Sequence, residues 1–163
     1  MDSNEKVLWK DEYKLGIELL DTQHKQLFSL VNKLYEPENQ QMTKEELAGI
    51  LYAFSDYMNV HFKDEEEYMS SIGYPGLLEH IQLHNELVNY LTSVIKTHAK
   101  VDILRTKMRL LAKRVLIDHV VHEDIKIKLF EISKANPDKL FFDNPEIELD
   151  EYVIDITDIE PDE

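Results

Sequence analysis

The sequence predicts an all-α protein: an antiparallel up-down four-helix bundle with an N-terminal arm and an acidic C-terminal tail. Apolar residues repeat with the helical period in four segments that are separated by short breaks. Short connections between helices favour antiparallel neighbours. None of the four glycines lies in a phosphate-loop or dinucleotide-binding fingerprint. The pattern therefore favours a bundle and does not suggest a nucleotide-binding fold.

The first two helices are expected over residues 21–35 and 43–70. The segment "PENQQM" breaks the first helix, and Thr43 with Glu46 has the form of a capping box that opens the second. The segment "GYPG" stops the second helix. The inward-facing residues predicted for these helices are Leu20, Leu27, Val31 and Leu34 in the first, and Leu47, Phe54 and His61 in the second.

The last two helices are expected over residues 77–97 and from Asp102, as the capping residue, to about Ser133. Apolar residues again mark one face of each helix. The inward-facing residues predicted here are Leu87, Val88, Leu91 and Ile95 in the third helix, and Leu104, Met108, Leu111 and Val115 in the fourth.

Charge and length divide the chain into a bundle domain, residues 1–136, and a tail, residues 137–163. The tail holds 11 acids against Lys139 alone, a net charge of −10, whereas the domain carries only −5. This acidity argues against a nucleic-acid-binding or anionic-membrane surface. No apolar run approaches the roughly 20 residues that span a bilayer, and the N-terminus has no signal-like apolar region. We therefore expect a cytoplasmic protein.

The tail contains "EIELDEYVIDITDIE", in which acids and aliphatic residues nearly alternate. We expect it to be solvated and flexible. An alternative is a docking segment that adds a strand to the sheet of a protein partner. In a eukaryotic setting, "VIDIT" beside acids is similar to a SUMO-interacting motif.

Histidines recur on the predicted inner faces of the helices. Residues four apart share a helix face, so His61 with Glu65, and His80 with His84, each form a pair suited to binding a metal. His24 and His119 extend the inner stripes of the first and fourth helices. Every helix thus contributes an imidazole to the interior.

A bound metal explains this burial of polar groups. Each polar group buried without a partner costs roughly 1–3 kcal/mol, which a domain stable by about 5–15 kcal/mol could not easily absorb at several positions. Five imidazoles and two carboxylates exceed the needs of one ion and suit two ions bridged by the carboxylates. Because cysteine is absent, the ligands must be His, Asp and Glu, which fit Fe, Zn, Cu or Ni without choosing among them.

The second carboxylate of this set lies in "DHVVHED". By spacing, Glu123 is the natural partner of His119, because it follows His119 by four residues and would share its helix face. Asp124, five residues after His119, could join the same site only if the helix is locally widened, as in a π-bulge.

These motifs resemble the hemerythrin family, including bacteriohemerythrins and the HHE cation-binding domain. The similarity runs from "VLWKDEYKLGIELLDTQH" through "HFKDEEEYM" and "YPGLLEHIQLH" to "HVVHED". The resemblance implies two iron ions, with Glu65 and Asp124, rather than Glu123, bridging them around an oxo or hydroxo group. The implied histidine ligands are His80, His84 and His119 for one iron and His24 and His61 for the other, while His98 and His122 match no ligand position.

The resemblance also implies reversible O2 binding at an open coordination position, for carriage, storage or delivery rather than catalysis. Leu27 and Phe62 are candidates for an apolar wall around O2. Val115 stands where many relatives carry Trp and would widen that pocket, and Asp118 stands where a neutral Asn is common. The alternatives are an O2 or redox sensor that signals through the tail, or a redox enzyme acting on peroxide, nitric oxide or ferrous iron.

Overall fold

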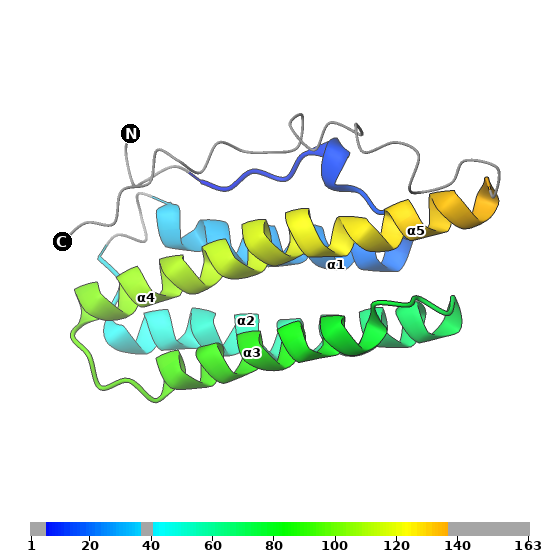
Figure 1. The fold of residues 1–163 in the computed structure, drawn as a ribbon. Coiled ribbons are helices and arrows are strands. Elements are labelled where there is room, and N and C mark those ends of the chain that lie inside the picture. Colours follow the sequence, from blue (N-terminus) through cyan, green and yellow to red (C-terminus); the bar gives the residue numbers. More distant parts are fainter. Residues whose placement is uncertain (1–5, 37–40, 137–163) are drawn as a thin grey trace.

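Four helical rods lie side by side in the computed structural model, which describes residues 6–36 and 41–136 (Figure 1). Neighbouring rods run in opposite directions, which confirms the predicted antiparallel bundle. The rods are α1 (Glu18–Asn32), continued by the 3₁₀ turn η2 (Lys33–Tyr35); α2 (Lys44–Ser71); α3 (Leu77–Ile95); and a long fourth rod made of α4 (Val101–Lys113), η4 (Arg114–Asp124) and α5 (Ile125–Ala135). The middle of the fourth rod, η4, is a π-helix.

The core lies between the rods and contains most of the predicted stripes. The buried residues that were predicted are Leu20, Leu27, Val31, Leu34, Leu47, Phe54, His61, Leu91, Leu104, Met108, Leu111 and Val115. The third helix differs in part, because Leu87, Val88 and Ile95 are only half-buried and pack at the edge of the core.

Local sequence signals explain where α2 begins and ends. The predicted capping box is present: the Thr43 hydroxyl accepts from the Glu46 backbone N–H, and the Glu46 carboxylate accepts from that of Thr43. At the other end Gly73 has φ of +67°, and the Gly73 and Tyr74 N–H groups donate to the carbonyls of Ser70 and Met69. This is a Schellman motif, which requires a left-handed residue that glycine adopts readily.

The fourth rod begins differently from the prediction. Lys100, with an extended backbone, is its N-cap, and Asp102 lies inside the first turn. The prediction of Asp102 as the cap was therefore wrong. Its carboxylate sits instead where the positive end of the helix dipole favours an acid.

The N-terminal arm packs on α1 through aromatic rings. Trp9 meets Phe28 edge-on at 5.4 Å between ring centroids, and Tyr13, in the 3₁₀ turn η1 (Asp11–Tyr13), stacks on Phe28 at 6.0 Å. The turn from the arm into α1 is held by Asp21, whose carboxylate accepts from the backbone N–H groups of Leu15 and Gly16.

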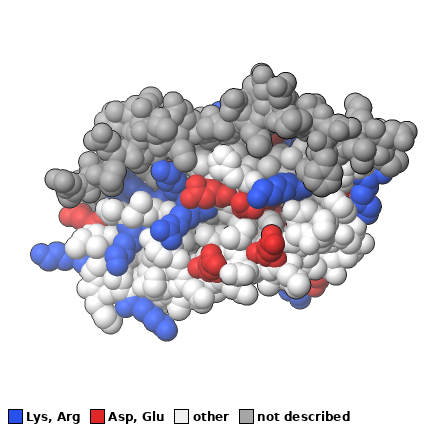
Figure 2. Space-filling model, in the orientation of Figure 1, with Lys and Arg blue, Asp and Glu red and all other residues white. Residues whose placement is uncertain are grey.

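The surface of the described domain carries charged side chains of both signs. On the face shown in Figure 2, Lys and Arg side chains are interspersed with carboxylates. Within the described ranges, no helix combines the length and apolar character that crossing a membrane requires. The predicted tail, residues 137–163, lies outside the described residues.

Candidate metal centre

All seven residues predicted as metal ligands come together inside the bundle. Each rod supplies at least one of them, and their exposed fractions are between 0% and 3%. They are His24 from α1, His61 and Glu65 from α2, His80 and His84 from α3, and His119 and Asp124 from η4.

Three histidines form one half of the cluster. The Nε2 atoms of His84 and His119 lie 2.9 Å apart. Glu65 Oε2 lies 3.1 Å from Nε2 of His84 and 3.2 Å from Nε2 of His80, and Asp124 Oδ1 lies 3.1 Å from Nε2 of both His80 and His119. We call His80, His84 and His119 the three-histidine group.

Two histidines form the other half, which we call the two-histidine group. The Nε2 atoms of His24 and His61 lie 3.0 Å apart. Asp124 Oδ2 lies 3.1 Å from Nε2 of His24, and Glu65 Oε1 lies 3.8 Å from Nε2 of both histidines.

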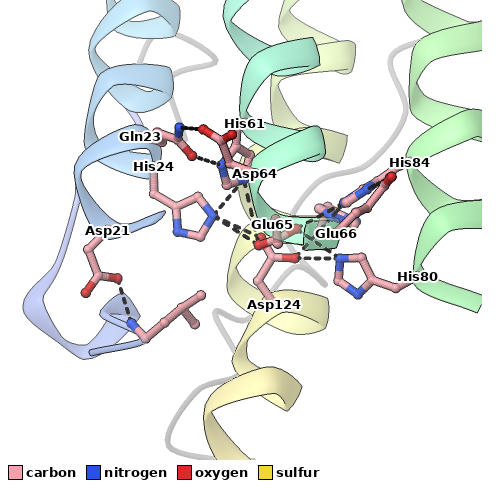
Figure 3. Close-up of polar contacts among 12 residues, drawn as sticks. Asp21, Gln23, His24, His61, Asp64, Glu65, Glu66, His80, His84 and Asp124 are labelled. Carbon is pink, nitrogen blue, oxygen red and sulfur yellow. Dashed lines mark hydrogen bonds and ion pairs between the residues drawn. The ribbon is translucent and has the colours of Figure 1, made fainter. Parts of the chain in front are cut away.

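Each carboxylate therefore faces both halves with different oxygen atoms. Figure 3 shows Glu65 and Asp124 between His24 on one side and His80 and His84 on the other. Counted by possible ligand atoms, Glu65 and Asp124 belong to both halves, which have five and four members respectively. This arrangement can hold two cations that share two carboxylates.

The π-helix explains how Asp124 rather than Glu123 reaches the cluster. In η4 the backbone bonds span five residues instead of four, so His119 and Asp124 share a face. Asp124 is fully buried, whereas Glu123 is half-buried and pairs with Lys126 at 2.7 Å. The simple four-residue spacing in the sequence had favoured Glu123.

The ligand atoms fit a metal better than they fit one another. Among the described residues, both Asp124 oxygens and Glu65 Oε1 are buried without a hydrogen-bond partner. Such groups cost about 1–3 kcal/mol each when left unsatisfied. Two ligand atoms at right angles around an ion, each about 2.1 Å from it, would lie about 3.0 Å apart. The separations of 2.9–3.2 Å match that value.

Electrostatics keep both carboxylates charged. Burial and Asp124 would raise the pKa of Glu65, but His61, His80 and His84 lower it to about 2. Burial would likewise raise the pKa of Asp124, but His119, His24 and His80 hold it well below its usual range. Burial lowers the pKa of His61 to about 4, which leaves this imidazole neutral and able to bind a metal. The two charged carboxylates give the interior a negative charge, which favours the binding of cations there.

The outer ring nitrogens of two histidines have partners that sequence reasoning did not predict. His84 Nδ1 donates to Glu66 Oε1 at 2.7 Å, and His61 Nδ1 donates to Gln23 Oε1 at 2.9 Å. Gln23 in turn donates through Nε2 to Asp64 Oδ2 at 2.6 Å. The position of Gln23 directly before His24 gave no signal of this role, because its target lies on another helix.

Of the three residues predicted as an apolar wall, Phe62 contacts histidine rings of both halves. Its ring stacks on His84 at 3.7 Å and 8° between planes, and lies 5.6 Å from the His119 ring and 5.9 Å from the His61 ring. Leu27 and Val115 are fully buried in the same hydrophobic cluster. The three residues lie in the core that surrounds the centre, which agrees with an apolar environment.

The remaining histidines lie outside the cluster: His98 is exposed and His122 is half-buried. Asp118 is also exposed, and it lines a surface cavity of about 280 Å³ between α3 and η4. His119 borders the same cavity. Asp118 therefore lies near the candidate ligand His119, on its solvent side.

Comparison with known proteins places this chain among metal-binding relatives. The family model described as "Hemerythrin HHE cation binding domain" matches residues 15–128. The bacteriohemerythrin of Campylobacter jejuni is 33% identical over 128 residues, which cover 78% of this chain and 92% of that protein. The bacteriohemerythrin of Clostridium acetobutylicum is 34% identical over 89 residues, 53% of this chain and 69% of that protein.

A more distant relative is the bacteriohemerythrin of Pseudomonas aeruginosa, 25% identical over 72% of this chain and 76% of that protein. No solved structure matches the chain significantly. The matched region covers most of the bundle and all seven clustered residues, from His24 to Asp124. The chain belongs to the hemerythrin family, whose members are non-haem iron proteins.

Proposed function

We propose that this protein holds two iron ions and binds O2 reversibly, for carriage, storage or delivery. The observation that supports this most directly is the unequal division of ligands. The three-histidine group with Glu65 and Asp124 offers five ligand atoms, whereas the two-histidine group with the same carboxylates offers four. The ion bound by His24 and His61 would thus keep one more position for an external ligand.

Each residue of the centre has a distinct task in this proposal. Glu65 and Asp124 would hold the two ions together, because each directs one oxygen to each half. Two ferrous ions, if held by these residues, would supply the electrons that O2 takes up on binding and returns on release. An imidazole-rich ligand set with only two carboxylates stabilises the ferric state less than a carboxylate-rich set would, which favours release.

The apolar surroundings support reversibility rather than turnover. Leu27, Phe62 and Val115 would exclude water and protons from the open side, since all three are buried. Proton exclusion slows irreversible oxidation of the centre. Among the described residues, Gln23 and Glu66 contact outer ring nitrogens of His61 and His84, and the Asp64 carboxylate accepts from Gln23, so these three polar side chains are engaged outside the space between the two halves. We therefore propose a binding protein rather than an enzyme.

We further propose that residues 1–136 form the iron-binding domain, that residues 137–163 form an acidic tail, and that the protein acts in the cytoplasm. In the alternative role, as a sensor, the state of the centre would change how the tail meets a protein partner. Deleting residues 137–163 separates the two roles, because a carrier should keep its O2 chemistry and lose no partner, whereas a sensor should lose its partner.

The deciding experiment is the visible spectrum of the iron-loaded protein, reduced without air, exposed to O2 and then deoxygenated. We expect an absorption band that develops with O2 and is lost on its removal, with two irons per chain by elemental analysis. Prompt oxidation without such a band would contradict reversible binding and favour the sensor or a redox enzyme acting on peroxide, nitric oxide or ferrous iron.

A further inference from the structure

We propose that Glu66 is a positioning residue that fixes the tautomer and orientation of His84 and makes the three-histidine group favour the more highly charged ion. This inference rests on the proposed iron centre. It assigns a role to a side chain that lies outside the set of seven ligands and next to Glu65 in the sequence.

The hydrogen bond between Glu66 and His84 has only one consistent direction. A carboxylate only accepts, so His84 Nδ1 must carry the hydrogen that it donates to Glu66 Oε1 at 2.7 Å. The other nitrogen, Nε2, then presents its lone pair to the interior, where it lies 3.1 Å from Glu65 Oε2. Figure 3 shows Glu66 beside His84. Glu66 thereby selects the tautomer that can bind a metal.

Stacking on Phe62 restricts the same imidazole in a second direction. The two rings are nearly parallel, 8° apart, with centroids separated by 3.7 Å. The hydrogen bond prevents rotation of the ring within its plane, and the stacking prevents tilting. The two contacts together restrict the orientation of His84, which is the usual purpose of partners to ligand histidines.

The two-histidine group lacks an equivalent charged contact. His61 donates to the neutral amide of Gln23, and the Asp64 carboxylate lies one hydrogen bond further out. Among the described residues, His24 Nδ1 is buried without a partner. In the described part of the chain, a carboxylate therefore accepts from the outer Nδ1 atom of a histidine in the three-histidine group, but not from that of His24 or His61.

This asymmetry has an electronic consequence. A carboxylate acceptor raises the basicity of a ligand imidazole, and its negative charge favours a ferric ion over a ferrous ion. The Glu66 side chain is 31% exposed, so solvent weakens the effect without removing it. Glu66 should lower the reduction potential of the iron held by the three-histidine group.

The test compares two variants that each remove one negative charge from α2. Glu66→Gln keeps a hydrogen-bond acceptor beside His84 but removes the charge. Glu67→Gln is the matched control, because the Glu67 side chain is 69% exposed and pairs with Lys63 at 3.9 Å. Both full-length proteins are loaded with iron, and their midpoint potentials and Zn²⁺ dissociation constants are measured beside the wild type.

We expect Glu66→Gln to weaken Zn²⁺ binding by about tenfold, the lower end of the range for the loss of such partners, because glutamine still accepts a hydrogen bond. Its midpoint potential should rise, and a tenfold change in the ferric-to-ferrous preference equals about 59 mV for a one-electron couple. Glu67→Gln should leave the potential unchanged. In the Zn²⁺-loaded protein, the ¹⁵N signal of His84 Nδ1–H should move in Glu66→Ala while the other ligand histidines keep their tautomers.

Equal potentials for Glu66→Gln, Glu67→Gln and the wild type would overturn this inference and leave the iron centre in place. Failure of the wild type to bind iron would overturn the proposed function, and this inference with it. A merely structural role of Glu66 is distinguished by the melting temperature of the metal-free variant, because the proposal expects a shifted potential with unchanged metal-free stability.

Discussion

Removing the metal should destabilise the whole bundle, because the candidate ligands come from all four rods. His24, His61, His84 and His119, one from each rod, are all buried. Metal bound only by the folded state stabilises that state, and the increment is about 4.1 kcal/mol when free metal is 1,000 times the dissociation constant. At about 2–4 °C per kcal/mol for a chain of this size, the melting temperature should fall by roughly 8–16 °C on removal.

The assay is thermal unfolding followed by circular dichroism, before and after anaerobic chelation. Two variants sharpen it. Glu65→Gln removes one shared carboxylate, so its melting temperature should become nearly independent of metal. His98→Ala changes an exposed histidine outside the cluster and should keep the full wild-type difference. A wild-type shift below about 2 °C would correspond to less than about 1 kcal/mol and would refute a centre that joins the four rods.

Three further predictions concern single side chains. Asp124→Asn should abolish binding of the second metal ion, as measured by elemental analysis, whereas Glu123→Gln should retain it; equal metal content would contradict the role of the π-helix. Burial and the Glu131 carboxylate raise the pKa of Tyr68 from 10.0 to about 12, so the neutral phenol stabilises the fold below pH 10 and this contribution is lost as pH rises toward 12. Tyr68→Phe should therefore remove one late step from the ultraviolet titration of phenolate; an unchanged titration would disprove the assignment. Thr43→Ala should cost about 1 kcal/mol of unfolding free energy in urea, and no loss would show that the capping box is not stabilising.

Much of the fold could be predicted from the sequence because its signals are local. The apolar period defines four rods, and the capping box at Thr43 depends only on residues three apart. The pairs His61 with Glu65 and His80 with His84 follow from one helical turn. The start of the fourth rod at Lys100 was missed, because a cap depends on backbone conformation, which Asp102 does not control alone.

The sequence by itself determined the chemistry of the centre: buried imidazoles and carboxylates, no thiolates, and ligands on every helix. Only the tertiary structure decided between Glu123 and Asp124 on the basis of geometry, because the π-helical turn changes which residues share a face. The contacts of Gln23, Asp64 and Glu66 could not be predicted from the sequence either, since each depends on how one helix is rotated and shifted against another. Helical spacing fixes neighbours within a rod, whereas packing between rods fixes which side chains support the metal ligands.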